Sequence, residues 1–339
     1  MYIIQNNKLK QTLIDWSAKF DVFAPQQVEN YSQYQPINPE KELILSDIHN
    51  TRFPPKAFFL PQSEVMLKFN AKLNKLEDYI PKPKPRILFG IRPCDAKAII
   101  LLDTVFCTEE YHDPYWKNKR DATIIIGMGC NDPCQTCFCT TVGGSPFNHD
   151  GLDALITEVD GALFVETFNE KTNELFNSFS KATKEQEKHV HLIQKSTESG
   201  MNKAFETKGL KQNLDQIFES EYWTQISESC LGCGVCTFLC PTCFCFDIVD
   251  EIYRNQRVRN WDTCMFRIYS QEASGHNPRP TRKERTRQRL MHKFSYWLDH
   301  VGEIGCTGCG RCVRYCPVGL DIRAMLSASY EAESEVVNV

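Results

Sequence analysis

Two cysteine runs with the same spacing are the residues of this sequence best suited to chemistry. Each run reads C-x2-C-x2-C-x3-C-P, the first over residues 230–241 and the second over residues 306–317. Thiolates at this spacing hold [4Fe–4S] clusters, and where two runs occur the fourth cysteine of each binds the other cluster. We therefore expect two clusters, one on Cys230, Cys233, Cys236 and Cys316, the other on Cys306, Cys309, Cys312 and Cys240.

The residues between these cysteines also suit cluster-binding loops. Glycines let the backbone turn tightly and let its amides approach the sulfides; they are Gly232, Gly234, Gly308 and Gly310. The proline after each fourth cysteine redirects the chain. A zinc site usually shows two C-x2-4-C pairs instead, so a zinc-stapled interaction protein is the alternative.

Five more cysteines gather farther toward the N-terminus. Apolar runs at 86–91 and 123–128 predict buried strands, and residues 96–102 between them predict a helix. Strand, helix and strand in this order predict a right-handed parallel unit, in which both strands end at the same sheet edge. Cys94 and Cys130 follow these two strand ends.

Three cysteines of this set come directly after Cys130, and they are Cys134, Cys137 and Cys139. Five thiols at one sheet edge favour a third [4Fe–4S] cluster. Zinc ligands and buried thiols without a role are the alternatives. The spacing alone leaves open which four of the five bind the cluster.

Four cysteines remain outside these sets. Cys243, Cys245 and Cys264 lie between the two runs and lack an evident fourth partner, so we favour thiols packed beside the clusters over a further metal site. Cys107 fits no pattern and is expected to be structural. Residues 279–289 hold six Lys or Arg and one Glu, which indicates either a solvated helix start or a docking face for an acidic partner.

Composition narrows the class of protein. The chain has 339 residues, 17 cysteines and a net charge of −4, which argues against a nucleic-acid-binding protein. The first residues do not form a signal peptide, and no apolar run approaches the ~18 residues that a membrane span needs. We therefore expect a cytoplasmic protein whose cysteines bind metal in a reducing, anaerobic setting.

These patterns predict an α+β chain of two domains. Residues 1–225 are expected to form an α/β domain with a partly parallel sheet, with strands at 42–46, 57–60, 65–69 and 162–166 and a short helix before the last. The wide separation of the two runs predicts an α-helical ferredoxin domain over 226–330, with helices at 246–255, 264–272 and 285–301. Residues 331–339 are expected to form an acidic tail.

Several segments resemble one known family. Those near the runs are Trp261-Asp-Thr-Cys264, residues 275–280 and Cys240-Pro-Thr-Cys243-Phe-Cys245; those farther N-terminal are Arg92-Pro-Cys94-Asp and residues 130–139. They are similar to the iron–sulfur subunit of anaerobic sulfite reductases and to the β subunit of cytoplasmic sulfhydrogenases. The resemblance covers about residues 85–325. In that family the position of Cys134 is often a small residue, which favours Cys94, Cys130, Cys137 and Cys139 as the third cluster's ligands, with Cys134 as the alternative.

The resemblance implies a non-catalytic iron–sulfur electron-transfer subunit of a hetero-oligomer. In the family this subunit relays electrons from a flavin subunit that oxidises NAD(P)H to a catalytic subunit. That partner is a sirohaem sulfite reductase, which converts sulfite to sulfide, or a nickel–iron hydrogenase. We expect the sulfite reductase branch, with the hydrogenase as the alternative. The sequence has no nucleophile motif and no G-x-G-x-x-G fingerprint, so neither catalytic nor dinucleotide-binding residues are expected.

Overall fold

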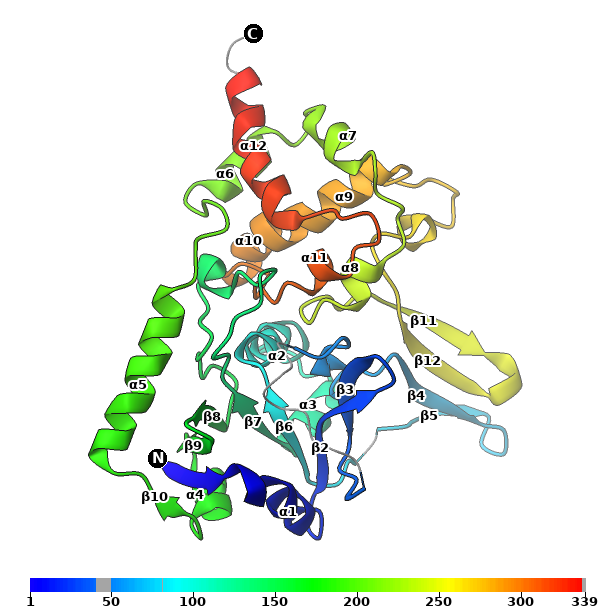
Figure 1. Cartoon of the computed structure of the whole chain (residues 1–339). Coiled ribbons are helices and arrows are strands. Elements are labelled where there is room, and N and C mark those ends of the chain that lie inside the picture. Colours follow the sequence, from blue (N-terminus) through cyan, green and yellow to red (C-terminus); the bar gives the residue numbers. More distant parts are fainter. Residues whose placement is uncertain (41–49, 81, 337–339) are drawn as a thin grey trace.

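The computed structural model describes residues 1–40, 50–80 and 82–336, so the strand predicted at 42–46 lies outside the described residues. A mixed sheet with its helices forms one half of the molecule, and a group of helices forms the other (Figure 1). The observed mixture of strands and helices confirms the predicted α+β class.

An eight-stranded sheet organises the first half, in the order β10-β1-β9-β8-β7-β6-β2-β3. Strands β2, β6, β7 and β8 run parallel, while the other pairs are antiparallel. Both strands of the predicted parallel unit are confirmed as β6 and β7, which pair in parallel. Their continuous apolar runs suit strands that are covered on both faces. The strands are β1 (Tyr2–Gln5), β2 (Asp21–Val28), β3 (Tyr31–Pro36), β6 (Arg86–Ile91), β7 (Thr123–Met128), β8 (Ala154–Val159), β9 (Ala162–Thr167) and β10 (Ser180–Lys181).

Helices cover both faces of this sheet. Helices α1 (Asn6–Trp16) and α4 (Glu170–Phe176) pack on one face, against side chains such as Phe89 and Ile126. Helices α2 (Pro93–Phe106) and α3 (Pro114–Asp121) pack on the other face, and α2 confirms the helix predicted at 96–102. Alternate residues of one strand therefore serve two cores, which holds the carboxyl ends of β6 and β7 in fixed positions.

A second sheet of four strands projects from the molecule as a wing (Figure 1). Its order is β11-β12-β4-β5, formed by β11 (Phe246–Glu251), β12 (Gln256–Trp261), β4 (Ser63–Asn70) and β5 (Lys75–Asp78). The prediction of a strand at 65–69 is confirmed. The prediction of a helix at 246–255 was wrong, because that segment pairs with β12, which in turn pairs with β4. The wing thus joins a segment between the two cysteine runs to the N-terminal half.

Three other local predictions were wrong. Residues 57–58 lie in the 3-10 turn η1 (Pro55–Phe58), whose proline is preorganised for a first helical position, and residues 59–60 form the turn that follows. Strand β8 occupies the place of the short helix expected before residue 162, and its apolar residues are buried on the sheet. Residues 264–272 form a turn and the 3-10 turn η4 (Arg267–Ser270).

The second half is a cluster of helices with its own core. Helices α9 (Arg282–Met291) and α10 (Trp297–Val301) are joined by the π-helical turn η5 (His292–Tyr296), which confirms the predicted amphipathic helix. A capping box starts it at Thr281, and Gly302, at φ +78°, ends it. The other helices are α6 (Leu210–Gln216), α7 (Tyr222–Ser227), α8 (Val235–Phe238), α11 (Arg311–Arg314) and α12 (Ile322–Val336).

The two-domain division stays a prediction. Helix α6 precedes the predicted boundary at residue 225 and α7 spans it, yet both pack into the core of the helical half. Helix α5 (Lys184–Ser199) runs along the side of the molecule (Figure 1). The predicted tail begins inside α12. Across the described ranges, the helices are too short or too polar to cross a membrane.

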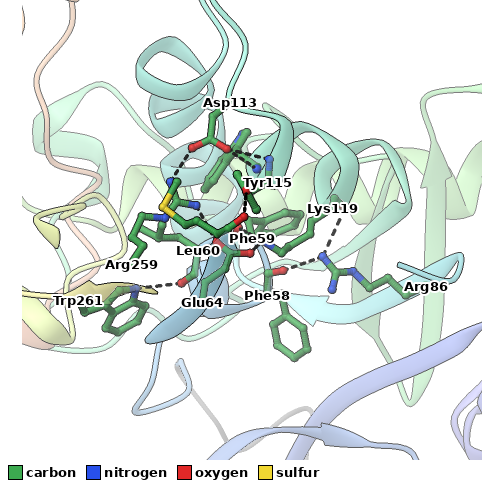
Figure 2. A network of polar contacts seen from close by, with 12 residues as sticks. Phe58, Phe59, Leu60, Glu64, Arg86, Asp113, Tyr115, Lys119, Arg259 and Trp261 are labelled. Carbon is green, nitrogen blue, oxygen red and sulfur yellow. Dashed lines mark hydrogen bonds and ion pairs between the residues drawn. The ribbon is translucent and has the colours of Figure 1, made fainter. Parts of the chain in front are cut away.

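A buried ionic network fixes the wing to the sheet-rich half (Figure 2). The guanidinium of Arg259, on β12, contacts Glu64 Oε2 at 2.7 Å and Asp113 Oδ2 at 2.5 Å, and all three side chains are buried. Lys119 donates to the other oxygen of Glu64. Asp113 also caps α3 by accepting from the amides of Tyr115 and Trp116. One arginine therefore satisfies carboxylates from two different segments of the chain.

Replacing this arginine should weaken the fold. In Arg259→Met the carboxylates of Glu64 and Asp113 lose a buried cation, so we expect the free energy of unfolding to fall by about 3–5 kcal/mol. The measurement is the urea-unfolding midpoint, followed by far-ultraviolet circular dichroism. Arg257→Met is the matched control, because Arg257 lies on the same strand with its Asp250 pair exposed to solvent. Equal midpoints for the two variants would contradict the assigned role.

Candidate metal centre

The first cysteine group combines both runs. A small cavity of about 50 Å³ is lined by three thiols of the first run and two of the second, namely Cys230, Cys233, Cys236, Cys312 and Cys316. Cys233 is exposed, and the other four are buried or half-buried. The crossed assignment needs Cys316 beside the first run, and the structure places it there. The assignment of individual ligands stays a prediction.

The second group lies deeper. Cys306, Cys309 and Cys312 belong to the second run, and Cys240 of the first run is an electrostatic neighbour of both Cys306 and Cys309. Burial raises the pKa of Cys306 to about 12 and that of Cys309 to about 11. Buried thiolates are therefore unfavourable here unless a metal binds them and takes up their charge.

The third group lies at the predicted sheet edge. One cavity is lined by Cys94 after β6, by Cys130 after β7, and by Cys134, Cys137 and Cys139 from the loop that follows. The structure joins Cys134 and Cys137 in a disulfide. A sulfur in a disulfide is not a thiolate ligand, so cluster binding by Cys137, or by the alternative Cys134, requires that bond to be reduced.

The third group contacts the second through two glycines. Gly308 has φ +66°, and a Cβ there would come within 2.5 Å of the Cys139 amide nitrogen. Gly310 has φ +73°, and its Cβ would lie 2.6 Å from the Thr136 carbonyl oxygen. Only glycine fits such contacts, which explains why these positions carry it. Cys309, between the two glycines, also lines the third group's cavity.

A fully buried ion pair ties the same two groups together. The Arg311 guanidinium contacts the two carboxylate oxygens of Asp95 at 2.5 and 2.7 Å, and neither side chain is more than 1% exposed. Asp95 follows Cys94, and Arg311 precedes Cys312. Arg311 also donates to the Thr51 carbonyl at 2.8 Å, and Asn50 donates to the Cys309 carbonyl at 2.8 Å.

Three buried cations face the thiols. Arg289 and Lys293 come from α9 and η5, and Lys56 comes from η1. Burial alone would lower the pKa of Lys293. The neighbouring Cys240, Cys243 and Cys306 outweigh the effect of burial and raise that pKa. The pKa of Arg289 is raised in the same way, against burial, by Cys236 and Cys312. Burial dominates at Lys56 and lowers its pKa, although Cys243 and Cys240 oppose it.

None of these cations pairs with a carboxylate among the described residues. Lys293 donates to Thr242 Oγ1 and to the Gly305 carbonyl, and Lys56 donates to the Cys243 carbonyl. The Nε of Arg289 is buried without a hydrogen-bond partner. Buried cations are ordinarily paired, so this arrangement fits an anionic group held by the thiols.

Hydrogen-bond donors also point at the sulfurs. The amides of Gly232 and Gly308 lie 3.4 and 3.5 Å from the sulfurs of Cys230 and Cys306, respectively. The Leu320 amide lies 3.3 Å from the Cys316 sulfur. Such donors stabilise thiolate sulfur and tune the potential of a bound cluster.

The thiols are grouped without converging on one point. Within the described ranges, no three His, Cys, Asp or Glu side chains come together as ligands of a single metal ion.

The remaining cysteines divide into two kinds. Cys243 shares a hydrogen bond with Cys240, and Cys245 shares one with Cys264. Cys107 lies apart, in a bridge with His112 at the end of α2. The sequence reasoning did not identify Arg289, Lys293 or Arg311 as site residues. For the first two, the available signal was a pair of cations four residues apart beside the apolar Leu290 and Phe294.

Comparison with known proteins agrees with this geometry. Residues 229–320 match the model of a family described as a 4Fe-4S dicluster domain. The chain is 32% identical over 307 residues to the sulfhydrogenase 2 subunit beta of Pyrococcus furiosus, which covers 88% of this chain and 89% of that protein. No solved structure matches the chain. The resemblance expected from the sequence is thereby confirmed: the chain belongs to the sulfhydrogenase beta subunit family and carries a 4Fe-4S dicluster domain.

Proposed function

We propose that this chain is a non-catalytic electron-transfer subunit that holds [4Fe–4S] clusters at all three cysteine groups. The observation that carries the proposal is the set of buried cations, Arg289, Lys293 and Lys56, which face thiols and have no carboxylate partner among the described residues. A cluster with four thiolate ligands is an anion, and it would supply the missing counter-charge. Bound clusters supply one-electron transfer.

The three groups form a row. Cys312 belongs to the second group and also lines the cavity of the first, while Cys309 belongs to the second and lines the cavity of the third. The second run is therefore shared along the whole row. The Asp95–Arg311 ion pair and the glycines Gly308 and Gly310 of that run hold the second and third groups against each other. Such a row suits relay between partners and requires no proton-transfer residues in this chain.

The outer end of the row reaches the surface at Cys233. Apolar side chains surround it, with Leu231 62% exposed and Val318 38% exposed. Arg267 and Arg282 are exposed and lie near Arg285, and the Cys230 thiol is close to Arg285 as well. Residues 279–289 were interpreted as either a solvated helix start or a docking face, and the position of Arg282 and Arg285 near Cys230 supports a docking face for an acidic partner.

The partners are inferred from the family. We propose a cytoplasmic hetero-oligomer in which a flavin subunit that oxidises NAD(P)H exchanges electrons with this chain, and a catalytic subunit lies at the other end of the row. A relative named as a sulfhydrogenase subunit favours the nickel–iron hydrogenase as that catalytic subunit. The sulfite reductase partner stays a prediction. Purifying the native complex and identifying its subunits tests both.

Metal analysis of the purified holoprotein tests the cluster count. Three [4Fe–4S] clusters correspond to about twelve irons and about twelve acid-labile sulfides per chain. The measurement is iron and sulfide by colorimetry, with zinc by mass spectrometry on the same sample. About eight irons per chain would contradict a third cluster, and stoichiometric zinc without sulfide would overturn the proposal.

The crossed ligands can be tested one cluster at a time. Cys240→Ser should damage the cluster at Cys306, Cys309 and Cys312, while Cys316→Ser should damage the one at Cys230–Cys236. Low-temperature electron paramagnetic resonance of the reduced holoprotein distinguishes the two. Cys107→Ser serves as the control and should leave both signals intact. If each variant lost the cluster of its own run, the crossing would be wrong.

The buried arginine should set the potential of the neighbouring clusters. Arg289→Gln removes one positive charge beside Cys236 and Cys312, so we expect a midpoint potential lower by roughly 90 mV, or about 2 kcal/mol for one electron in a partly buried site. Spectroelectrochemical titration measures it. Arg287→Gln is the matched control, because Arg287 lies on the same helix and pairs with Glu219 at the surface. Equal potentials in the two variants would contradict the proposed role of Arg289 as the counter-charge of a cluster.

A further inference from the structure

The base of the wing hairpin brings together two cysteines that the cluster assignment does not use. The β11–β12 ladder begins at the pair Phe246 and Trp261. Beyond it the Asp262 amide donates to the Cys245 carbonyl at 2.9 Å. Cys264 follows two residues later, and both its thiol and its backbone amide hydrogen-bond to the Cys245 sulfur. Neither residue belongs to the three cysteine groups defined above.

The two thiols form an asymmetric pair. They share a hydrogen bond, and the Tyr269 hydroxyl of η4 bonds to Cys245 as well. The bond from Cys264, opposed by burial and aided by Tyr269, lowers the pKa of Cys245 to about 6. The same bond, together with burial, raises the pKa of Cys264. Near neutral pH one sulfur is therefore a thiolate, and the other keeps its proton.

The surroundings preserve this asymmetry. The cation facing Cys245 is Lys293, and Lys56 lies near it as well. Cys264 has Arg289 and the Cys236 thiol as its charged neighbours. The one carboxylate in the set, that of Asp262, acts on Tyr269. Both cysteines are half-buried.

We propose that Cys245 and Cys264 form a redox-active dithiol that exchanges with low-molecular-mass disulfides. A hydrogen-bonded pair with one thiolate and one thiol has the arrangement of an attacking and a resolving cysteine. Cys264 is an electrostatic neighbour of Cys236 in the first cysteine group, and Lys293, which faces Cys245, also faces Cys240 and Cys306 of the second. The exchange itself needs no iron, so it stands apart from the proposed function.

The exchange proceeds in two balanced steps. The Cys245 thiolate attacks one sulfur of R–S–S–R, which forms a Cys245–S–R bond and releases RS⁻. The Cys264 thiol then loses its proton and attacks the Cys245 sulfur, closing the Cys245–Cys264 bond and releasing the second RS⁻. Two electrons pass from the protein to the small disulfide, whose thiolates take up that proton and one from solvent.

The test uses the full-length holoprotein in glutathione redox buffers under anaerobic conditions. Free thiols are alkylated after equilibration, and peptides are identified by mass spectrometry. We expect a disulfide linking the peptides of Cys245 and Cys264, formed reversibly. Cys264→Ser should trap glutathione on Cys245, and Cys245→Ser should trap it on Cys264 roughly tenfold more slowly or less, because the thiolate is the attacking species. Cys107→Ser should behave as the unmodified chain.

Two outcomes would overturn the proposal. One is an absence of both the linked peptides and any glutathione on Cys245 at every buffer ratio. The other is a loss of iron in Cys245→Ser or Cys264→Ser relative to Cys107→Ser, which would make these thiols cluster ligands and leave the proposed function intact.

The pH profile gives a second readout in the folded, unmodified chain. The rate of Cys245 alkylation by iodoacetamide should rise through a midpoint near the pKa of about 6. Tyr269→Phe removes a donor to the thiolate, so the midpoint should move to higher pH. A profile with the midpoint of an ordinary free cysteine, near 8.5, would contradict the asymmetric pair.

Discussion

The Asp95–Arg311 ion pair is the contact on which the arrangement of this molecule depends. Each partner stands next to a cysteine that is expected to bind metal, and the two residues come from opposite halves of the chain. Both are buried, so each would leave an uncompensated charge if the other were removed. The pair is therefore a constraint on geometry: the halves fit together only where the second run meets the sheet edge of the third group.

Electrostatics explains why the cysteine groups are more than collections of buried thiols. Burial alone disfavours thiolates, as the raised pKa values of Cys306 and Cys309 show. Cations placed against those thiols act in the opposite direction, and the π-helical turn η5 directs Lys293 toward Cys240 and Cys306. Such turns often mark functional positions in helices. The site is thus prepared for negative charge before any cluster is inserted.

Local patterns predicted much of this structure. The runs 86–91 and 123–128 are apolar after their first residues, Arg86 and Thr123, and each is a strand of that length. The segment 246–255 was mistaken for a helix because its hairpin with β12 is held as a sheet by β4, which pairs with β12 from far earlier in the chain. The cysteine spacing predicted the two cluster-binding runs, and the strand–helix–strand order predicted that Cys94 and Cys130 lie at one sheet edge. Arg289, Lys293 and the Cys245–Cys264 contact depend on how distant segments pack, which short-range periodicity does not encode.

The wing has a consequence for the order in which the chain can fold. Strand β4 leaves the ribosome long before β12, its partner, and Glu64 and Asp113 emerge long before Arg259. Until then β4 presents an open strand edge beside carboxylates that lack their cation. Pairings this far apart in sequence form slowly, and open edges invite association with other chains. The edge of β4 is therefore closed only when synthesis has passed the first cysteine run and β12 is available, and not when the N-terminal half is complete.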